Sequence, residues 1–195
     1  MVLYFSGTGN SRYVAKKIAE ISGDEVISIN QKLKKGDYSQ VNSEKAFVFL
    51  GPVYAGRLPR IMEDYIRKVT FTGTSRVYFI ATCAATPWIT DSYVEKLCNE
   101  KNFSVLGFNS IIMPQGYIVG GGTESNEVNE RILKDTDPKI IKIAETIRDK
   151  QMLSKEQPGK AMMSKVLNPI MYSMIINVLI CTFLSPLFCT LFSTI

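Results

Sequence analysis

The chain has 195 residues, of which 46% are hydrophobic and 21% charged, a composition typical of a globular protein rather than a disordered or many-spanning membrane protein. Its net charge is +5, but charges of both signs alternate without a long basic block, so we expect a mixed solvated surface and no nucleic-acid binding. The absence of histidine excludes the catalytic triads, metal sites and proton shuttles that depend on this residue.

The four cysteines form no Cys-x-x-Cys pair, which argues against a zinc ribbon and against a cysteine-ligated iron–sulfur cluster. We therefore predict no metal site. The apolar start of the chain is too short for a secretory signal and runs directly into a glycine loop. We expect a cytoplasmic protein without a disulfide framework.

Short apolar runs alternate with amphipathic segments over the first 150 residues, a pattern typical of βαβ units and of a parallel sheet covered on both faces. The helical spacing of apolar residues predicts helices over 11–21, from Pro59, over 88–98 and from Asp137-Pro138 onward. The segment after Ile29 reads as a polar, lysine-rich loop. Five apolar runs are predicted as strands, at residues 2–5, 25–29, 46–50, 77–81 and 105–113.

These elements predict an α/β fold with a doubly wound, five-stranded parallel sheet in the order 2-1-3-4-5. In such a sheet a ligand binds beyond the carboxyl ends of the strands, where the strand order reverses. Three loops are expected at that edge: residues 6–11, 51–58 and 82–88.

The first loop combines three hydroxyl groups, a side-chain amide and two glycines at the start of a helix, which suits a phosphate group. It contains no lysine, and Arg12 stands where the motif Gly-x-Gly-x-x-Gly needs its third glycine, so a monophosphate fits better than a diphosphate or triphosphate. The alternative is a simple strand-to-helix turn with a serine cap. The residues expected to bind the phosphate are Ser6, Gly7, Thr8, Gly9, Asn10 and Ser11.

The other two loops have the residues to flank a flat heterocycle. In one of them Tyr54 either packs against the ring or belongs to a loop that merely connects strand and helix. In the other, Trp88 either stacks on the ligand or joins the core, and Cys83 either touches the ligand or is a small buried hydrophobe. The expected binding residues are Pro52, Val53, Tyr54, Ala55 and Gly56, together with Thr82, Cys83, Ala84 and Ala85.

The stretch from Tyr4 to Ser11, together with the loop from Pro52 to Pro59, resembles the flavodoxin family. More narrowly, these motifs and the segment Met113–Ile118 resemble the flavodoxin-like half of flavodoxin–ferredoxin fusion proteins, over residues 1–172. The resemblance implies non-covalent FMN, with residues 6–11 at the phosphate and 52–56 and 82–86 beside the isoalloxazine. It also implies that the Ala55-Gly56 peptide can turn its carbonyl toward flavin N5 when that nitrogen is protonated.

The resemblance implies an electron-transfer protein that exchanges electrons with a redox partner, either a ferredoxin-like protein or a small acceptor. The alternative is an FMN-dependent NAD(P)H:quinone-type oxidoreductase, for which Gly120, Gly121 and Gly122 would open room for a second substrate. No catalytic acid or base is evident, and hydride transfer to a flavin needs none. A third reading is a flavin-free interaction domain that kept the fold.

The C-terminal region differs from the fusion proteins, which continue into cysteine-rich ferredoxin modules. We predict a flavodoxin-like domain over residues 1–157 and a linker with a hydrophobic tail over 158–195. No charged residue occurs after Lys165, and the apolar run is long enough to cross a bilayer. Residues 170–195 are expected to attach the domain to the cytoplasmic face of a membrane, to pack on the domain or a second copy, or to be a degenerate end.

Overall fold

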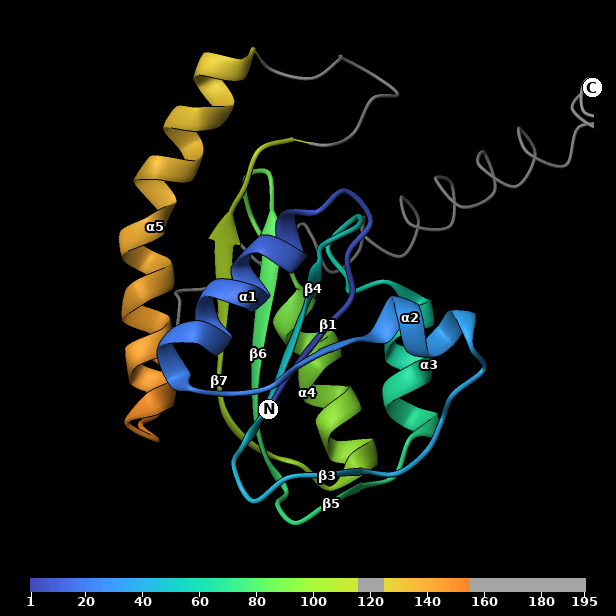
Figure 1. Ribbon diagram of the computed structural model, residues 1–195. Helices are drawn as coiled ribbons and strands as arrows, with labels where there is room; N and C mark the ends of the chain where they lie inside the picture. The colour runs from blue at the N-terminus through green and yellow to red at the C-terminus, as the bar shows by residue number, and fades with distance from the viewer. Residues whose placement is uncertain (116–124, 155–195) are drawn as a thin grey trace, which may run out of the picture. The chain divides into compact units, whose positions relative to one another are not determined.

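The computed structural model describes residues 1–115 and 125–154 (Figure 1). The glycine-rich segment at 120–122 and the hydrophobic tail lie outside the described residues. The domain boundary at residue 157 and the membrane attachment through 170–195 therefore stay predictions. Within the two described ranges, none of the helices combines the length and the apolar character needed to cross a membrane.

A five-stranded parallel sheet forms the centre of the described part. Its strands lie in the order β2-β1-β4-β6-β7, with each adjacent pair parallel. This arrangement confirms the predicted doubly wound order, because β4, β6 and β7 are the third, fourth and fifth of the expected strands. The bounds are β1 (Val2–Tyr4), β2 (Val26–Ser28), β4 (Phe47–Pro52), β6 (Arg76–Cys83) and β7 (Ser104–Ile112).

The helices cover both faces of this sheet, with α1 and α5 on one side and α3 and α4 on the other (Figure 1). One short helix and a second sheet were not expected. The lysine-rich segment after β2 is a short helix rather than a loop, and a small second sheet pairs β3 (Val41–Asn42) with β5 (Phe71–Thr72). The helices are α1 (Asn10–Ser22), α2 (Ile29–Lys34), α3 (Arg60–Lys68), α4 (Thr90–Lys101) and α5 (Asn126–Arg148).

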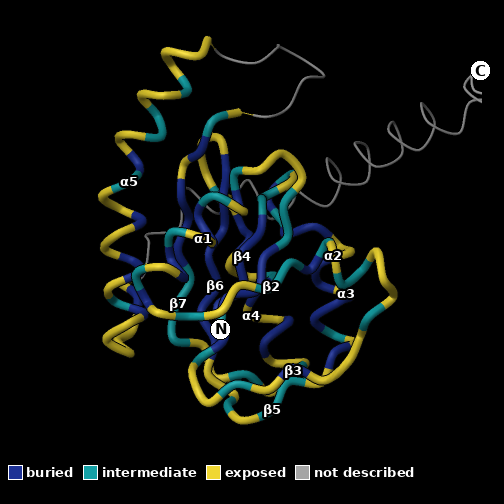
Figure 2. Tube along the Cα trace, viewed as in Figure 1, coloured by how far each residue is buried: buried dark blue, intermediate teal, exposed yellow. Residues whose placement is uncertain are grey.

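The side chains of the buried strands point alternately to the two faces of the sheet, which divides the core into two halves. Val48 and Leu50 of β4 belong to a cluster with α1 and α5, whereas Phe47 and Phe49 belong to a cluster with α3 and α4. Successive side chains of an extended chain point to opposite faces, so one apolar strand supplies both halves. The inner strands β1, β4 and β6 are accordingly buried along most of their length, while the edge strands β2 and β7 are partly exposed and the outer sides of the helices carry most of the exposed residues (Figure 2).

The last helix is longer than the sequence pattern predicted. Its expected start at Asp137-Pro138 is wrong, because α5 begins at Asn126 and Pro138 lies inside it. The Ser125 hydroxyl caps this start by accepting a hydrogen bond from the Val128 amide at 3.4 Å. The early turns of α5 are mostly exposed and therefore lack the apolar stripe that reveals a buried helix.

The segment after α5 returns along the edge of the sheet. The amide of Leu153 donates to the carbonyl of Leu106 at 3.0 Å, and the side-chain amide of Asn109 donates to the carbonyl of Ser154 at 3.0 Å. The hydroxyl of Tyr78 donates to the carbonyl of Gln151 at 2.7 Å. These bonds occupy part of the open edge of β7, which would otherwise present unpaired backbone groups.

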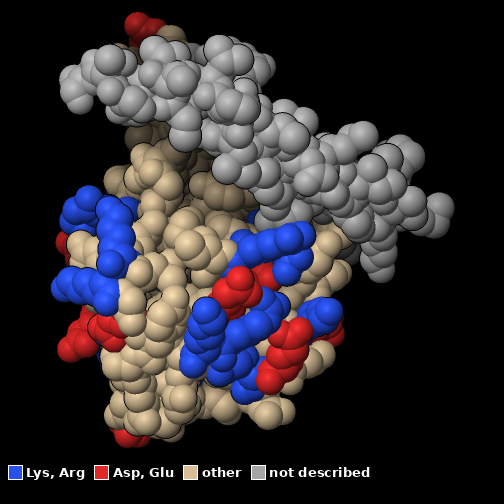
Figure 3. All heavy atoms as spheres, turned by 90° about the vertical axis from the view of Figure 1, so that its right-hand side faces the viewer, with Lys and Arg blue, Asp and Glu red and all other residues tan. Residues whose placement is uncertain are grey.

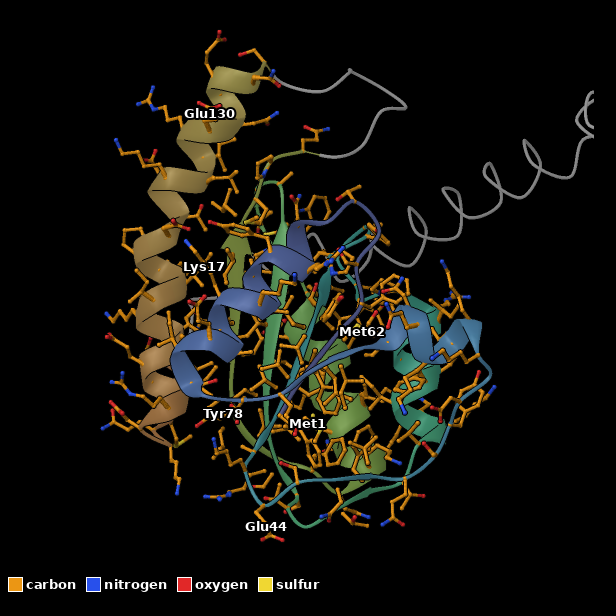
Figure 4. The ribbon with its side chains drawn as sticks, in the orientation of Figure 1. Met1, Lys17, Glu44, Met62, Tyr78 and Glu130 are labelled. Carbon is orange, nitrogen blue, oxygen red and sulfur yellow. The ribbon has the colours of Figure 1, made fainter. Side chains whose placement is uncertain are left out.

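Asp137 links α5 to α1. Its carboxylate forms an ion pair with Lys17, which lies where α1 faces α5 (Figure 4), and accepts a hydrogen bond from the Tyr13 hydroxyl at 2.9 Å. The hydrogen bond from Lys17 lowers the pKa of Asp137, with a smaller contribution from Tyr13. Because the pKa is lower in the folded state, this contribution to stability is complete above the unfolded-state pKa of about 4 and is lost as the pH falls.

We therefore expect Asp137→Asn to lower the free energy of unfolding at pH 7 by about 1 kcal/mol, a modest effect because both partners are partly exposed. The difference from the wild type should shrink as the pH falls from about 5 to about 3, measured by urea unfolding at each pH. Asp135→Asn is the matched control, since Asp135 is exposed and forms only a long ion pair of 3.9 Å with the exposed Arg131. Equal effects of the two substitutions would contradict the assignment.

Candidate functional site

The register of the sheet brings the three expected loops to one edge. Tyr4 of β1 lies opposite Leu50 of β4, and Pro52 of β4 lies opposite Thr82 of β6. The alignment continues beyond the strands, because the amide of Val53 donates to the carbonyl of Thr82 at 2.8 Å. The loops that follow β1, β4 and β6 therefore leave the sheet side by side.

The first loop exposes backbone at the start of α1. Gly7, Thr8 and Gly9 are exposed, and Gly9 adopts a left-handed conformation with φ 106°. The Ser6 hydroxyl accepts a hydrogen bond from the Gly9 amide at 3.1 Å, which closes the loop. Among the described residues, no side chain caps this helix N-terminus. The first-turn N–H groups of α1 thus keep the donor capacity that an anion at a helix N-terminus uses.

Two further side chains expected to bind the phosphate also make structural contacts. The hydroxyl of Ser11 is buried and shares a hydrogen bond with the hydroxyl of Thr82 at 2.8 Å, which joins α1 to β6. The side-chain amide of Asn10 donates to the carbonyl of Pro114 at 2.7 Å. The groups of this loop that remain directed to solvent are its backbone and the side chain of Thr8.

The second loop is a tight two-residue turn. Tyr54 and Arg57 exchange backbone hydrogen bonds of 2.8 and 3.2 Å across it. The two central residues have positive φ, 49° at Ala55 and 75° at Gly56, as in the turns that connect adjacent strands of a hairpin. Glycine adopts this conformation freely, but alanine is strained there, which is often a mark of functional loops.

Tyr54 connects the second loop to the first. A Cβ atom placed on Gly7 would lie 2.7 Å from the Tyr54 hydroxyl oxygen, so the two loops are in direct contact and Gly7 leaves room for the phenol. The Tyr54 ring is nonetheless 47% exposed, which leaves apolar ring surface open beside the start of α1. Burial raises the pKa of the Tyr54 phenol above its ordinary value, and the hydroxyl remains a neutral donor.

The third loop contributes small residues and an exposed indole. Ala84 and Ala85 are exposed, whereas the Cys83 sulfur is buried and lies 3.9 Å from the carbonyl of Ile111. The expected helix start at Trp88 is wrong, since Trp88 has a positive φ of 54° and α4 begins at Thr90. The indole is 38% exposed rather than part of the core.

A buried ion pair beneath the second loop was not predicted. Both carboxylate oxygens of Glu63 accept hydrogen bonds from the guanidinium of Arg57, at 2.8 and 2.5 Å, and the Glu63 side chain is only 2% exposed. A usable signal exists in the sequence: Glu63 stands three positions before Ile66, on the stripe that α3 buries. Only a structure identifies its partner.

The site thus combines a helix N-terminus that lacks a side-chain cap with an adjoining surface of exposed tyrosine, indole and alanine side chains. Such a donor set fits a phosphate ester joined to a flat heterocycle: the phosphate faces backbone N–H groups, and the ring faces apolar surface. The arrangement lies at the edge where all three expected loops meet, and the assignment of the individual binding residues stays a prediction.

Comparison with known proteins gives one family match. A model of the flavodoxin domain matches residues 1–106, more than half of the chain. No curated protein matches the sequence significantly. The narrower resemblance to flavodoxin–ferredoxin fusion proteins stays a prediction.

Solved structures of similar fold have low sequence identity. The flavodiiron core from Synechocystis is 15% identical with a TM-score of 0.45, covering 77% of this chain and 36% of that one, so this chain spans about a third of it. A flavodoxin from Streptococcus pneumoniae is 14% identical with a TM-score of 0.43, covering 76% and 97% of the two chains. The Trp repressor binding protein from Bacillus subtilis is 14% identical with a TM-score of 0.48, covering 80% and 99%.

The hydrogen bond between Ser11 and Thr82 gives a direct test of how α1 is held at the site. Ser11→Ala leaves the buried Thr82 hydroxyl without its partner, and we expect the free energy of unfolding to fall by about 1–2 kcal/mol. Adding Thr82→Val removes the orphaned hydroxyl and should recover part of that loss. Chemical denaturation of Ser11→Ala, Thr82→Val and the double variant measures the coupling energy between the two side chains. Strictly additive losses of stability would contradict a hydrogen bond between them.

Proposed function

Since this chain belongs to the flavodoxin domain family, whose members are flavin-binding redox proteins, we propose that it binds FMN and transfers electrons. The observation that carries the proposal is the contact between Tyr54 and Gly7, which joins the phosphate-type loop to the exposed aromatic turn in one continuous site. FMN has the two parts that this site fits, a terminal phosphate and a planar ring. The bound flavin would supply the electron chemistry, and the protein supplies binding and orientation.

The backbone of residues 7–9 and the first N–H groups of α1 would hold the phosphate. Their hydrogen bonds and the positive end of the helix dipole favour a dianion without a lysine or a metal ion. Ser11 and Asn10 contribute indirectly, because their bonds to Thr82 and Pro114 fix the start of α1 against the sheet and its neighbouring loop.

The turn of residues 54–57 and the loop after β6 would hold the ring. Tyr54 offers the face of its phenol, and the short side chains of Ala84 and Ala85 allow a ring edge to approach the backbone. Ala55 is partly exposed and Gly56 is buried, and the peptide between them would lie beside the ring. A redox partner, either a ferredoxin-like protein or a small acceptor, would exchange electrons at this edge.

Binding is tested by titrating the purified full-length protein with FMN and following the quenching of flavin fluorescence. We expect the wild type to bind and Thr8→Glu to bind about tenfold more weakly or worse, because the new carboxylate repels the phosphate. Ser75→Glu is the control, since it adds the same charge at an exposed position before β6, at the opposite end of the sheet. A wild type that binds no FMN, or equal weakening by both variants, would contradict the proposed site.

The flavin-loaded protein also separates an electron carrier from a reductase. We expect no sustained oxidation of NADH or NADPH in the presence of a quinone, together with rapid electron exchange with a reduced ferredoxin. Sustained nicotinamide turnover would instead support the NAD(P)H:quinone-type oxidoreductase.

A further inference from the structure

The ion pair between Arg57 and Glu63 fixes the base of the second loop. Arg57 is the last residue of the turn, and Glu63 lies in the first part of α3. The guanidinium Nε and one terminal nitrogen each donate to a separate carboxylate oxygen, a bidentate geometry that fixes both the position and the orientation of the planar group. The side chains are 19% and 2% exposed, so water competes little for these bonds.

Two further contacts hold the pair in place. The Arg57 guanidinium carbon lies 4.5 Å from the centre of the Tyr93 ring on α4, a cation–π arrangement. Arg67, one turn further along α3, reaches the same carboxylate at 3.4 Å and also bonds Glu100 at 2.7 Å. In the view onto the side of α2 and α3, basic and acidic side chains are intermixed on the surface (Figure 3). Through the contacts of Arg57 with Glu63 of α3 and with Tyr93 of α4, the turn is linked to both of these helices.

Hydrophobic packing alone does not account for this arrangement. Burying a carboxylate is costly, and apolar side chains of similar size at such positions are often equally stable. A buried bidentate ion pair fixes one defined geometry, whereas a pair of apolar side chains does not. Here that geometry belongs to a turn whose Ala55 has an unfavourable positive φ of 49° and which would otherwise relax.

We propose that Glu63 is a positioning residue for the cofactor site, which through Arg57 holds the turn of residues 54–57 in the geometry that receives the flavin ring. The inference rests on the proposed function. Because the base of the turn is fixed, conformational change is confined to the peptide between Ala55 and Gly56. The free energy of cofactor binding then includes little cost for ordering the loop.

The decisive variant is Glu63→Gln, which keeps the shape of the side chain and removes its charge. Glu100→Gln is the matched control, because the Glu100 carboxylate also bonds an arginine of this network, but its partner is Arg67 of α3 rather than a residue of the turn. In the FMN-free protein we expect the amides of Tyr54 and Arg57 to exchange hydrogen about tenfold faster in Glu63→Gln, relative to amides of β6, and at the wild-type rate in Glu100→Gln.

In the FMN-loaded protein we expect Glu63→Gln to bind FMN about fivefold more weakly or worse, because the loosened turn must be ordered on binding. The midpoint potential for adding the first electron to the bound flavin should fall relative to the potential for adding the second. A residue that only stabilises the fold would leave this difference between the two potentials unchanged. Arg57→Lys should give an intermediate effect, because it keeps the charge but loses the bidentate bond and the flat contact with Tyr93. This variant replaces Glu63→Gln in the test if Glu63→Gln does not fold.

Unchanged amide exchange and unchanged potentials in folded Glu63→Gln or Arg57→Lys would overturn the inference. Equal changes in Glu100→Gln would also overturn it, since they would assign the effect to the helices rather than to the turn. If the wild type binds no FMN, the proposed function fails, while the exchange comparison in the FMN-free protein still decides whether Glu63 holds the turn.

Discussion

The register of the parallel sheet is the constraint on which the rest of this structure depends. Because β1, β4 and β6 run in the same direction and end at neighbouring positions, three loops far apart in the chain leave the sheet together. The strands can hold this register because both of their faces are buried, one against α1 and α5 and the other against α3 and α4. A slip of one residue would exchange the two halves of the core.

The edge of the sheet where the loops meet contains backbone conformations and a buried charge that lower the stability of the folded chain. Ala55 and Trp88 adopt positive φ, and a carboxylate is buried beneath the turn at Glu63. Each carries a cost that the surrounding contacts must offset. The middle of the sheet differs from this edge, because its core consists mainly of buried apolar side chains. This contrast is expected where a rigid scaffold supports a binding site.

The side chains at the site fall into two kinds of task. Ser11, Asn10 and Glu63 make internal bonds that hold elements together, whereas Thr8 and Tyr54 present open surface. A motif reading treats all the polar residues of the first loop alike, since each hydroxyl or amide is a suitable donor. The structure distinguishes them, because a hydroxyl that already bonds a neighbouring strand fixes the loop and does not face the solvent.

The sequence by itself determined the elements whose signals are local: the apolar strands, the glycine-rich loop before α1 and the alternation that predicts a doubly wound sheet. It also placed the three loops at one edge, because the direction of parallel strands follows from the order of βαβ units. The start of α5, the small helix α2 and the conformation of Trp88 were misjudged or missed, since exposed turns of helix carry no apolar stripe and left-handed φ is not restricted to glycine. Only the tertiary structure decided that Ser11 faces Thr82 and that Glu63 holds Arg57, because such pairings depend on the distance between elements and leave no pattern along the chain.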